Sequence, residues 1–250
     1  MRLEAADTTR LLKHRHAAEG GYQRGEETRA RIITTAVDLF GEHGFDGTST
    51  RDIASQAEVR TPALQYYFDS KEGLYLACVK HVIEQFWNYM SNVVERAESA
   101  LAQNARDDAL IDAFCAVQMQ WADLFCTDDI NGWRRLLLRQ ASDLSPSFAF
   151  QAYYEGVTQR MFTVTAGIVG RLLGVPAEST ESQIRAVALG GQLAIFHATR
   201  RTVLLRKLKL KSNEADRLAL LKRVIGEQTA AVLRSIAATR VAKRPAPSRR

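Results

Sequence analysis

Apolar residues in this chain recur at three- and four-residue spacing almost throughout its 250 residues. This spacing places them along one face of an α-helix, whereas a half-buried strand would alternate apolar and polar residues. No long alternating run occurs, and clusters of Val, Ile and Thr bounded by turn residues are missing. We therefore expect an all-α fold.

Turn and capping residues divide this helical pattern into segments. Gly44 suits the end of a first helix from about Glu26 to His43, because a left-handed backbone is needed there. Ser70 suits the start of a long helix that reaches about Ala100. Two short helices fit between them, near 50–57 and 61–67. Further helices are expected over residues 107–126, 131–141, 146–173, 180–203 and 213–239.

The two ends of the chain differ from its middle. Residues 1–24 hold many charges and the pair Gly20-Gly21, which predicts a flexible arm with at most a short helix. Residues 241–250 include two prolines and four basic residues, which predicts a disordered basic tail. Between them we expect a three-helix head over 25–73 and a larger helical body over 74–240.

Composition and motifs exclude several classes of protein. No apolar run reaches the roughly 18 residues of a membrane span, and the charged N-terminus is no secretory signal. The three cysteines form no CxxC pair, which favours reduced thiols in a cytoplasmic protein. The histidines form no close metal pair on a helix, and there is no Gly-rich phosphate loop or nucleophile elbow. We expect no metal site and no enzymatic activity.

Charge is spread unevenly along the chain. The net charge is +6, yet residues 200–250 alone hold 15 Lys and Arg against 3 Asp and Glu. The run from Arg200 to Lys211 has six basic residues and no acid. A solvated surface is its simplest interpretation, and a DNA-backbone contact or a surface for an anionic partner are the alternatives. Net charge alone therefore does not locate a nucleic-acid site.

The segment from Phe45 to Leu74 has what a helix pair needs to enter the DNA major groove. Hydroxyl and amide donors near the start of its first helix can hold phosphates. On its second helix, Gln65 can pair with adenine and Ala63 can contact a thymine methyl group. The expected DNA-contacting residues are Thr48, Thr50, Arg51, Arg60, Thr61, Ala63, Gln65, Tyr66, Tyr67 and Lys71.

One ordered set of residues runs through this part of the chain: Ala36, Phe40, Gly44, Phe45, Thr48, Thr50, Ile53, Ala54, Ala57, Val59, Leu64, Tyr66, Tyr67, Phe68, Lys71 and Leu74. In these residues the chain resembles the TetR family of transcriptional regulators. The resemblance implies a three-helix DNA-binding head on a body that binds ligand and dimerises.

Two positions depart from the family pattern. Glu58 stands where the family usually has glycine, and a positive φ there would cost roughly 1 kcal/mol. Arg60 stands where Ser or Thr is usual, so we expect capping to pass to Thr61. The alternative interpretation is a helical hairpin inside an unrelated α-bundle, whose tyrosines would be core or surface residues.

Aromatic and polar residues mix between Phe114 and Phe162, as a ligand cavity between helices requires. We expect an unidentified small-molecule effector and no other cofactor. The alternative is a packed core with a solvated face. The residues expected to bind the effector are Gln118, Trp121, Arg139, Gln140 and Tyr154.

Small residues recur every four positions from Gly190, and apolar residues line one side of the last helix. Small residues let helices approach closely, so we expect these two helices to pair with those of a second copy. Packing within one chain is the alternative, and the TetR resemblance favours the dimer. The expected interface residues are Gly190, Ala194, Ala198, Leu218, Leu221, Ile225, Val232 and Ile236.

The body also resembles the CecR-like subgroup of the family. The resemblance lies in Trp133, the stretch 134–139, Pro146, Phe148, Tyr154, Gly191, Gln192 and the stretch 196–200.

Together these features predict a ligand-responsive dimeric transcriptional regulator, a repressor that binds palindromic operator DNA. Its partners would be double-stranded DNA, a small-molecule effector and a second copy of the chain, and no membrane. The two reading helices would lie one turn of DNA apart, about 34–36 Å. The alternative is an architectural DNA-binding protein without an effector, which would need no cavity.

Overall fold

The computed structural model describes residues 4–126, 131–140, 146–198 and 214–242, and every regular element within those ranges is helical. The expected all-α class is therefore confirmed. The head consists of α1 (Glu4–His43), α2 (Thr50–Gln56) and α3 (Thr61–Phe68). The body consists of α4 (Lys71–Ala102), α5 (Asp107–Phe125), α6 (Gly132–Gln140), α7 (Ser147–Tyr153), the π-helix η1 (Tyr154–Thr158), α8 (Gln159–Leu173), α9 (Thr180–Ala198) and α11 (Glu214–Ala242).

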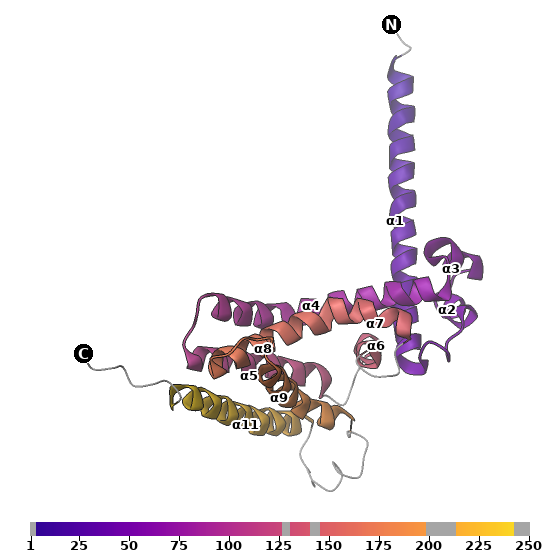
Figure 1. Cartoon of the computed structure of the whole chain (residues 1–250). Helices are drawn as coiled ribbons and strands as arrows, with labels where there is room; N and C mark the ends of the chain where they lie inside the picture. The colour runs from indigo at the N-terminus through magenta and orange to yellow at the C-terminus, as the bar shows by residue number, and fades with distance from the viewer. Residues whose placement is uncertain (1–3, 127–130, 141–145, 199–213, 243–250) are drawn as a thin grey trace.

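Helix α1 is longer than the sequence pattern indicated. It begins at Glu4, so most of the residues expected as an arm belong to the helix. In Figure 1 this part of α1 projects beyond α2 and α3. The segment is rich in Ala, Leu, Glu, Lys and Arg, which are strong helix formers, and the backbone stays helical through Gly20 and Gly21. The flexibility of this segment stays a prediction.

The three helices of the head enclose a small apolar core. Ile32, Phe40 and Ile53 are fully buried, and Leu64 and Phe68 place one face of α3 against them. The Arg31 guanidinium donates to the carbonyl of Ala57 at 2.9 Å, at the end of α2. Burying one face of α3 leaves its opposite face to solvent.

Helix α4 joins the head to the body. Ser70 caps it as expected, because its hydroxyl accepts a hydrogen bond from the Gly73 amide at 3.1 Å. In Figure 1 α4 runs from the head to the opposite end of the body, with α7 and α8 beside it and α5 packed against it. Helix α11 packs against α5 and α8 and closes the body.

The helix expected over residues 146–173 is divided by one turn of π-helix, η1. Such a turn inserts a residue, frees a backbone carbonyl from regular pairing and is frequent at functional sites. Here the indole of Trp87 donates to the carbonyl of Gly156 at 2.6 Å. A Cβ at Gly156 would lie 2.7 Å from Cδ1 of Ile83, so glycine permits this close contact with α4.

The remaining ends and connections agree in part with the sequence pattern. Gly44 takes a positive φ of 78° and ends α1 as expected, and Gly174, with a φ of 76°, ends α8. Helix α9 is described as far as Ala198. The basic run that starts at Arg200 and the tail from Lys243 lie outside the described residues. No helix in the described ranges is both long and apolar enough to cross a lipid bilayer.

None of the three cysteines, Cys78, Cys115 and Cys126, is joined in a disulfide in the described structure. Burial raises the pKa of the Cys78 thiol, and it also raises the pKa of the Cys115 thiol. Only the thiolate is a strong nucleophile, so both groups are unreactive near neutral pH.

Candidate nucleic-acid interface and ligand cavity

Helix α3 presents a polar and aromatic face to solvent. Gln65 is exposed, and Tyr66 retains 82% of its accessible surface. Arg60 and Thr61 at the start of the helix are also exposed, and Ala63 is half-buried. The exposed face of α3 therefore carries the residues expected to read bases.

Helix α2 begins beside this face with a capping box. The hydroxyl of Ser49 accepts from the Asp52 amide at 3.1 Å, and the carboxylate of Asp52 accepts from the Ser49 amide at 3.4 Å. The first helical residue, Thr50, is half-buried, and Arg51 is exposed. Both side chains are at least partly exposed, and their contact with phosphate stays a prediction.

Thr48 does not belong to the contact surface. It is 2% exposed, and its hydroxyl donates to the carbonyls of Leu39 at 3.2 Å and Gly44 at 2.8 Å. The expectation of a DNA contact from this side chain is corrected, because the loop after α1 folds the hydroxyl inward. Its role is to hold the end of α1 against that loop.

Tyr67 and Lys71 are each partly engaged inside the head. Tyr67 is half-buried and packs against the core, with its ring 5.1 Å from that of Tyr66. The ammonium of Lys71 lies 4.3 Å from the centre of the Phe45 ring, a cation–π contact. Contact with a phosphate would draw Lys71 away from this ring. Because Tyr67 is half-buried, Tyr66 is the more exposed of the two tyrosines.

The turn between α2 and α3 has the strain that the sequence indicated. Glu58 has a φ of +53°, which confirms a left-handed backbone at a non-glycine residue. Arg60 is the N-cap of α3 and makes no side-chain capping bond. Thr61 is already the first residue of the helix, so the expected transfer of capping to it is wrong.

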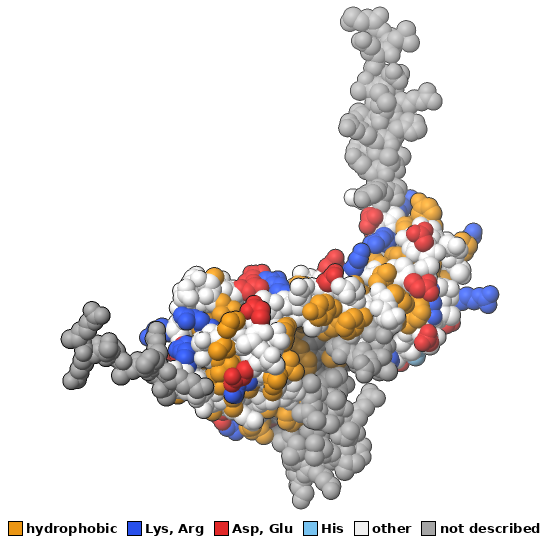
Figure 2. All heavy atoms as spheres, viewed as in Figure 1, with side chains coloured by type: hydrophobic (Ala, Val, Ile, Leu, Met, Phe, Trp, Pro, Cys, Tyr) orange, Lys and Arg blue, Asp and Glu red, His pale blue; other side chains and the backbone are white. Residues whose placement is uncertain are grey.

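Charge on the head is mixed. Figure 2 shows Lys and Arg side chains beside Asp and Glu side chains over the visible face of the head. This agrees with the sequence, in which the basic excess lies near the C-terminus rather than in the head. Individual donors on α2 and α3, rather than a uniform positive field, are what the head offers to a phosphate backbone.

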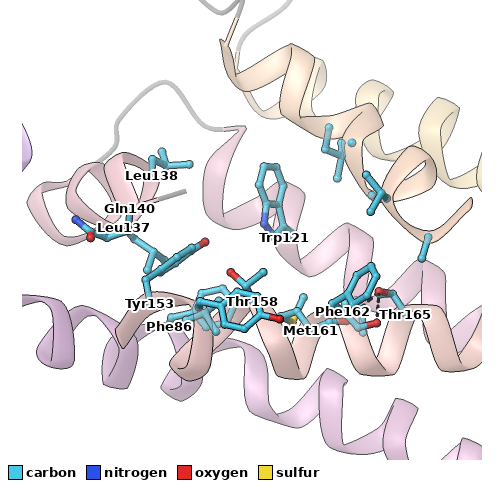
Figure 3. Close-up of a pocket in the computed structure, with 18 of the residues that line it drawn as sticks. Phe86, Trp121, Leu137, Leu138, Gln140, Tyr153, Thr158, Met161, Phe162 and Thr165 are labelled. Carbon is cyan, nitrogen blue, oxygen red and sulfur yellow. Dashed lines mark hydrogen bonds between the residues drawn. The ribbon is translucent and has the colours of Figure 1, made fainter. Parts of the chain in front are cut away.

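A cavity of about 820 Å³ lies in the body. Four of the five residues expected to bind an effector line it: Gln118, Trp121, Gln140 and Tyr154. Figure 3 shows Trp121 entering from α5, opposite Phe86, Thr158 and Met161. The π-helix η1 supplies Tyr154, Val157 and Thr158 to the wall. Nothing in the sequence spacing indicated this turn, so Thr158 was missed.

The fifth expected residue, Arg139, lies elsewhere. Its guanidinium donates to the carbonyls of Gly41 at 2.9 Å and Glu42 at 2.8 Å, at the end of α1. The expected effector contact is corrected, because free carbonyls and the negative dipole end of α1 attract a cation. Arg139 therefore joins the body to the head.

The neighbouring residue, Gln140, faces the cavity and also contacts α4. It is 1% exposed, and its amide nitrogen donates to the hydroxyl of Tyr75 at 2.7 Å. Burial raises the pKa of Tyr75, although the Gln140 bond opposes the rise, so the phenol is neutral. Helix α6 thus touches the cavity, α4 and the end of α1.

Aromatic rings fill the junction between head and body. The ring of Tyr75 lies 4.9 Å from Phe40, 5.2 Å from Phe45 and 5.8 Å from Phe148, each in edge-to-face geometry. Phe148 belongs to α7, and Phe150, two residues further on, lines the cavity. Figure 2 shows hydrophobic side chains at the surface in the region of α7. Helix α7 is therefore a second connection between cavity and head.

The residues expected at a dimer interface fall into four groups. Ile225 and Ile236 are each 5% exposed and pack within the chain, so they are corrected to core residues. Leu218 and Leu221 pack partly against the same cluster as Ile225. Val232 and Gly190 are exposed, whereas the side chains of Ala194 and Ala198 lie outside the described residues.

A different apolar face of these two helices is open to solvent. Ile184 and Val187 of α9 are 63% and 60% exposed. Leu220 and Val224 of α11 are 38% and 43% exposed. The body needs one side of α11 for its own core, which leaves the opposite side to solvent. The sequence showed an apolar stripe on α11 but could not show which surface it covers.

No group of three or more His, Cys, Asp or Glu side chains in the described ranges could hold a metal ion.

Comparison with known proteins identifies both parts of the chain. Residues 32–78 match the model of bacterial regulatory proteins of the tetR family, and residues 110–236 match the C-terminal domain of the HTH-type transcriptional dual regulator CecR. CecR of Shigella flexneri is 30% identical over 184 residues, 73% of this chain and 81% of that protein. IcaR of Staphylococcus aureus strain Newman, a negative transcriptional regulator of a biofilm operon, is 38% identical over 64 residues, 26% of this chain and 32% of that protein.

Solved structures support the same fold. A TetR-family regulator from Mesorhizobium loti MAFF303099 has a TM-score of 0.53 at 19% identity, with 86% of this chain and 98% of that chain covered. AibR, solved in complex with isovaleryl coenzyme A and operator DNA, has a TM-score of 0.50 at 17% identity, with 68% and 85% covered. The head, the helical body and these matches together place the chain in the TetR family of transcriptional regulators, with a C-terminal domain of the CecR type.

Proposed function

We propose that this protein is a ligand-responsive, dimeric transcriptional repressor that binds palindromic operator DNA through α2 and α3. The observation that carries the proposal is the exposed face of α3, where Gln65 and the 82%-exposed Tyr66 lie on a helix whose other face is buried. A helix presented in this way fits the major groove. Such a regulator acts on the chromosome, in the cytoplasm of a bacterial cell.

The cavity favours a ligand-responsive regulator over an architectural DNA-binding protein. A volume of about 820 Å³ lies within the range of small-molecule sites, and a purely architectural protein has no need of it. The fold supports both kinds of binding in AibR, which was solved with a coenzyme A ester and operator DNA. IcaR, which is similar to the head, is a negative transcriptional regulator, and this favours repression.

Helices α6 and α7 provide the proposed coupling between ligand and DNA. Gln140 lies between the cavity and Tyr75 of α4, and Arg139 holds the end of α1. A ligand that displaces Gln140 would move α6 relative to α1, which belongs to the head, and to α4, which joins the head to the body. A ligand can shift the balance between two arrangements of head and body only if it binds one of them more tightly. We place the origin of that preference at the contact between the ligand and Gln140.

The exposed apolar faces of α9 and α11 support the proposed dimer. Ile184 and Val187 lie on one, and Leu220 and Val224 on the other. Two copies related by a two-fold axis would cover both faces in a four-helix contact. The two α3 helices would then reach successive major grooves, and a small change in their separation would weaken binding at both half-sites.

DNA binding by the purified protein tests the proposal directly. A bound site is first selected from random duplexes, and its affinity is measured by fluorescence anisotropy at fixed salt. Gln65→Ala should weaken binding to that site by about 5- to 150-fold, the range for loss of one bidentate base contact. Tyr66→Phe should have a smaller effect that is similar for all sequences, because the hydroxyl would contact phosphate.

Ser99→Ala is the matched control, since Ser99 is exposed near the far end of α4. It should bind as the unmodified protein does. If no sequence is enriched, or if Gln65→Ala binds the selected site unchanged, the proposed reading helix is wrong.

A further inference from the structure

The described part of the cavity wall carries no formal charge, because its lining contains no Lys, Arg, His, Asp or Glu side chain. Burying an ionised group without a partner costs far more than a single hydrogen bond returns, so this part of the wall favours a molecule that is uncharged where it is buried. Burial also raises the pKa of Tyr153, which keeps this phenol neutral in the wall.

Aromatic rings form much of this wall. Phe86, Phe114, Trp121 and Phe162 come from three helices, α4, α5 and α8, and Figure 3 shows Trp121 across the cavity from Phe86 and Met161. Ring faces and edges on several sides favour a guest that is itself aromatic, because offset and edge-to-face contacts add to the burial of apolar area. The volume of about 820 Å³ suits a molecule of several rings.

Some polar groups of the wall already have partners in the protein. The amide nitrogen of Gln140 donates to Tyr75, and the hydroxyl of Thr165 donates to the carbonyls of Met161 and Phe162 on its own helix. Gln118 lines the cavity from α5, is 5% exposed, and has a buried side-chain atom without a partner.

The side-chain amide of Gln118 has a hydrogen-bond partner for its nitrogen but none for its oxygen. Its amide nitrogen donates to the carbonyl of Leu189 on α9 at 2.8 Å, and its Oε1 is buried without any hydrogen-bond partner. The carbonyl of Leu189 can only accept, so the nitrogen must face it and the oxygen must face away. A buried acceptor without a donor is costly, and a donor on the guest would remove that cost.

We propose that the cavity binds an uncharged, multi-ring aromatic molecule that donates an N–H or O–H hydrogen bond to Oε1 of Gln118. This inference deepens the proposed function, because it names the class of effector for the same cavity. It also separates this protein from a receptor for coenzyme A esters, whose phosphates would find no cationic side chain in the described wall. Gln118 is the specificity-determining residue.

Three fluorescent probes with one skeleton test the proposal. Phenylnaphthylamine is uncharged and has one N–H donor, its N-methyl derivative lacks the donor, and anilinonaphthalene sulfonate adds a negative charge. Binding is followed by the rise in probe emission and by the loss of tryptophan emission, with Trp121→Phe identifying energy transfer from the cavity. Phenylnaphthylamine should bind roughly 5- to 150-fold more tightly than its N-methyl derivative. It should bind more tightly still relative to the sulfonate.

Gln118→Met keeps the length of the side chain and removes the acceptor. In this variant the preference for the N–H probe over its N-methyl derivative should disappear, while the preference over the sulfonate should remain. The inference is overturned if the sulfonate binds the unmodified protein as tightly as the neutral probe. It is also overturned if the N–H probe has no advantage, or keeps its advantage in Gln118→Met.

Probe binding needs no DNA, so this test is independent of the regulator assignment. If the probes rank as expected while a saturating probe leaves operator affinity unchanged, the ligand chemistry stands and ligand responsiveness to this class fails. If the ranking fails while Gln65→Ala still loses operator affinity, the DNA-binding assignment stands and the ligand chemistry is wrong.

Discussion

Single residues next to one another in this chain serve different structures. Arg139 and Gln140 are consecutive, yet one donates to carbonyls of α1 and the other donates to Tyr75 beside the cavity. Thr48 and Ser49 are consecutive, yet the first is buried and the second caps α2. On a helix or a tight turn, adjacent side chains point in directions about 100° or more apart. Residue type alone therefore predicts a role at such positions but not the partner.

Glu58 gives a test at the residue scale. Its φ of +53° is strained for any residue with a Cβ, and its side chain is exposed, so Glu58→Gly should raise the free energy of unfolding by up to about 1 kcal/mol. The greater freedom of glycine in the unfolded chain opposes part of that gain. The measurement is denaturant unfolding without DNA. Glu58→Ala keeps the strained Cβ and should match the unmodified protein. A glycine variant no more stable than the alanine variant would show that the strain at this turn is no larger than the entropy cost of glycine.

At the scale of elements, the contacts between helices decide what each helix does. Helix α7 and helix α8 pack along α4, and η1 between them turns Gly156 toward Trp87 and Ile83. The same turn supplies Thr158 to the cavity. Further along, Arg160 of α8 makes two 2.8 Å contacts with the carboxylate of Glu98 on α4 and lies 4.5 Å from the centre of the Trp87 ring. The packing of η1 and the Glu98–Arg160 ion pair therefore hold η1 and α8 against α4.

The Glu98–Arg160 pair predicts a pH dependence of stability. The hydrogen bond and charge of Arg160 hold the pKa of Glu98 below its ordinary value. Ionised Glu98 therefore stabilises the folded protein fully above its unfolded-chain pKa of about 4.3. This stabilisation is lost as pH falls through the lower pKa of the folded protein. Glu98→Gln should lower the melting temperature slightly at pH 7, because both side chains are more than one third exposed. The difference from the unmodified protein should shrink as pH falls below the unfolded-chain pKa of Glu98 and should vanish once Glu98 is protonated in the folded protein as well.

Glu84→Gln, an exposed carboxyl on the same helix, serves as the control for this titration. The two variants should differ at pH 7 and converge in acid. A Glu98→Gln deficit that stays constant from neutral pH to acid would mean that the ion pair does not fix α8 against α4.

At the scale of the whole molecule, head and body share one continuous structure. Tyr75 of α4 packs with Phe40 and Phe45 of the head and with Phe148 of the body. Helix α6 packs closely on α1, where a Cβ at Gly41 would lie 2.7 Å from the carbonyl of Gly132. A change in the body can therefore reach the head through direct contacts. The exposed apolar faces on α9 and α11 lie outside this junction.

Arg139 tests the connection between body and head. Arg139→Ala removes two charge-assisted hydrogen bonds to the end of α1, so we expect a loss of about 1 to 2 kcal/mol in unfolding free energy. Arg139→Lys keeps a cation near the dipole but cannot form the same paired contact, so its loss should be smaller. Calorimetry gives both values. An alanine variant with an unchanged melting transition would place the connection elsewhere.

The exposed apolar faces predict the oligomeric state. Sedimentation at micromolar concentration should give a dimer for the unmodified protein. Ile184→Asp and Val224→Asp each place a charge on one of these faces and should shift the protein toward monomer. Thr163→Asp changes an exposed residue on α8 and should remain dimeric. A monomeric unmodified protein, or a dimer that survives both charge variants, would rule out this interface.

The sequence by itself determined the all-α class, the helix-turn-helix and most helix ends, because periodicity, caps and left-handed turn positions act over a few residues. It also indicated four residues that line the cavity, because mixed aromatic and polar residues on neighbouring helices are typical of a ligand site. The tertiary structure alone decided that Thr48 is buried, that Arg139 holds α1, which side of α11 is open and where η1 breaks the regular helix. Each of these depends on contacts between residues far apart in the chain, and local spacing carries no record of which surfaces meet.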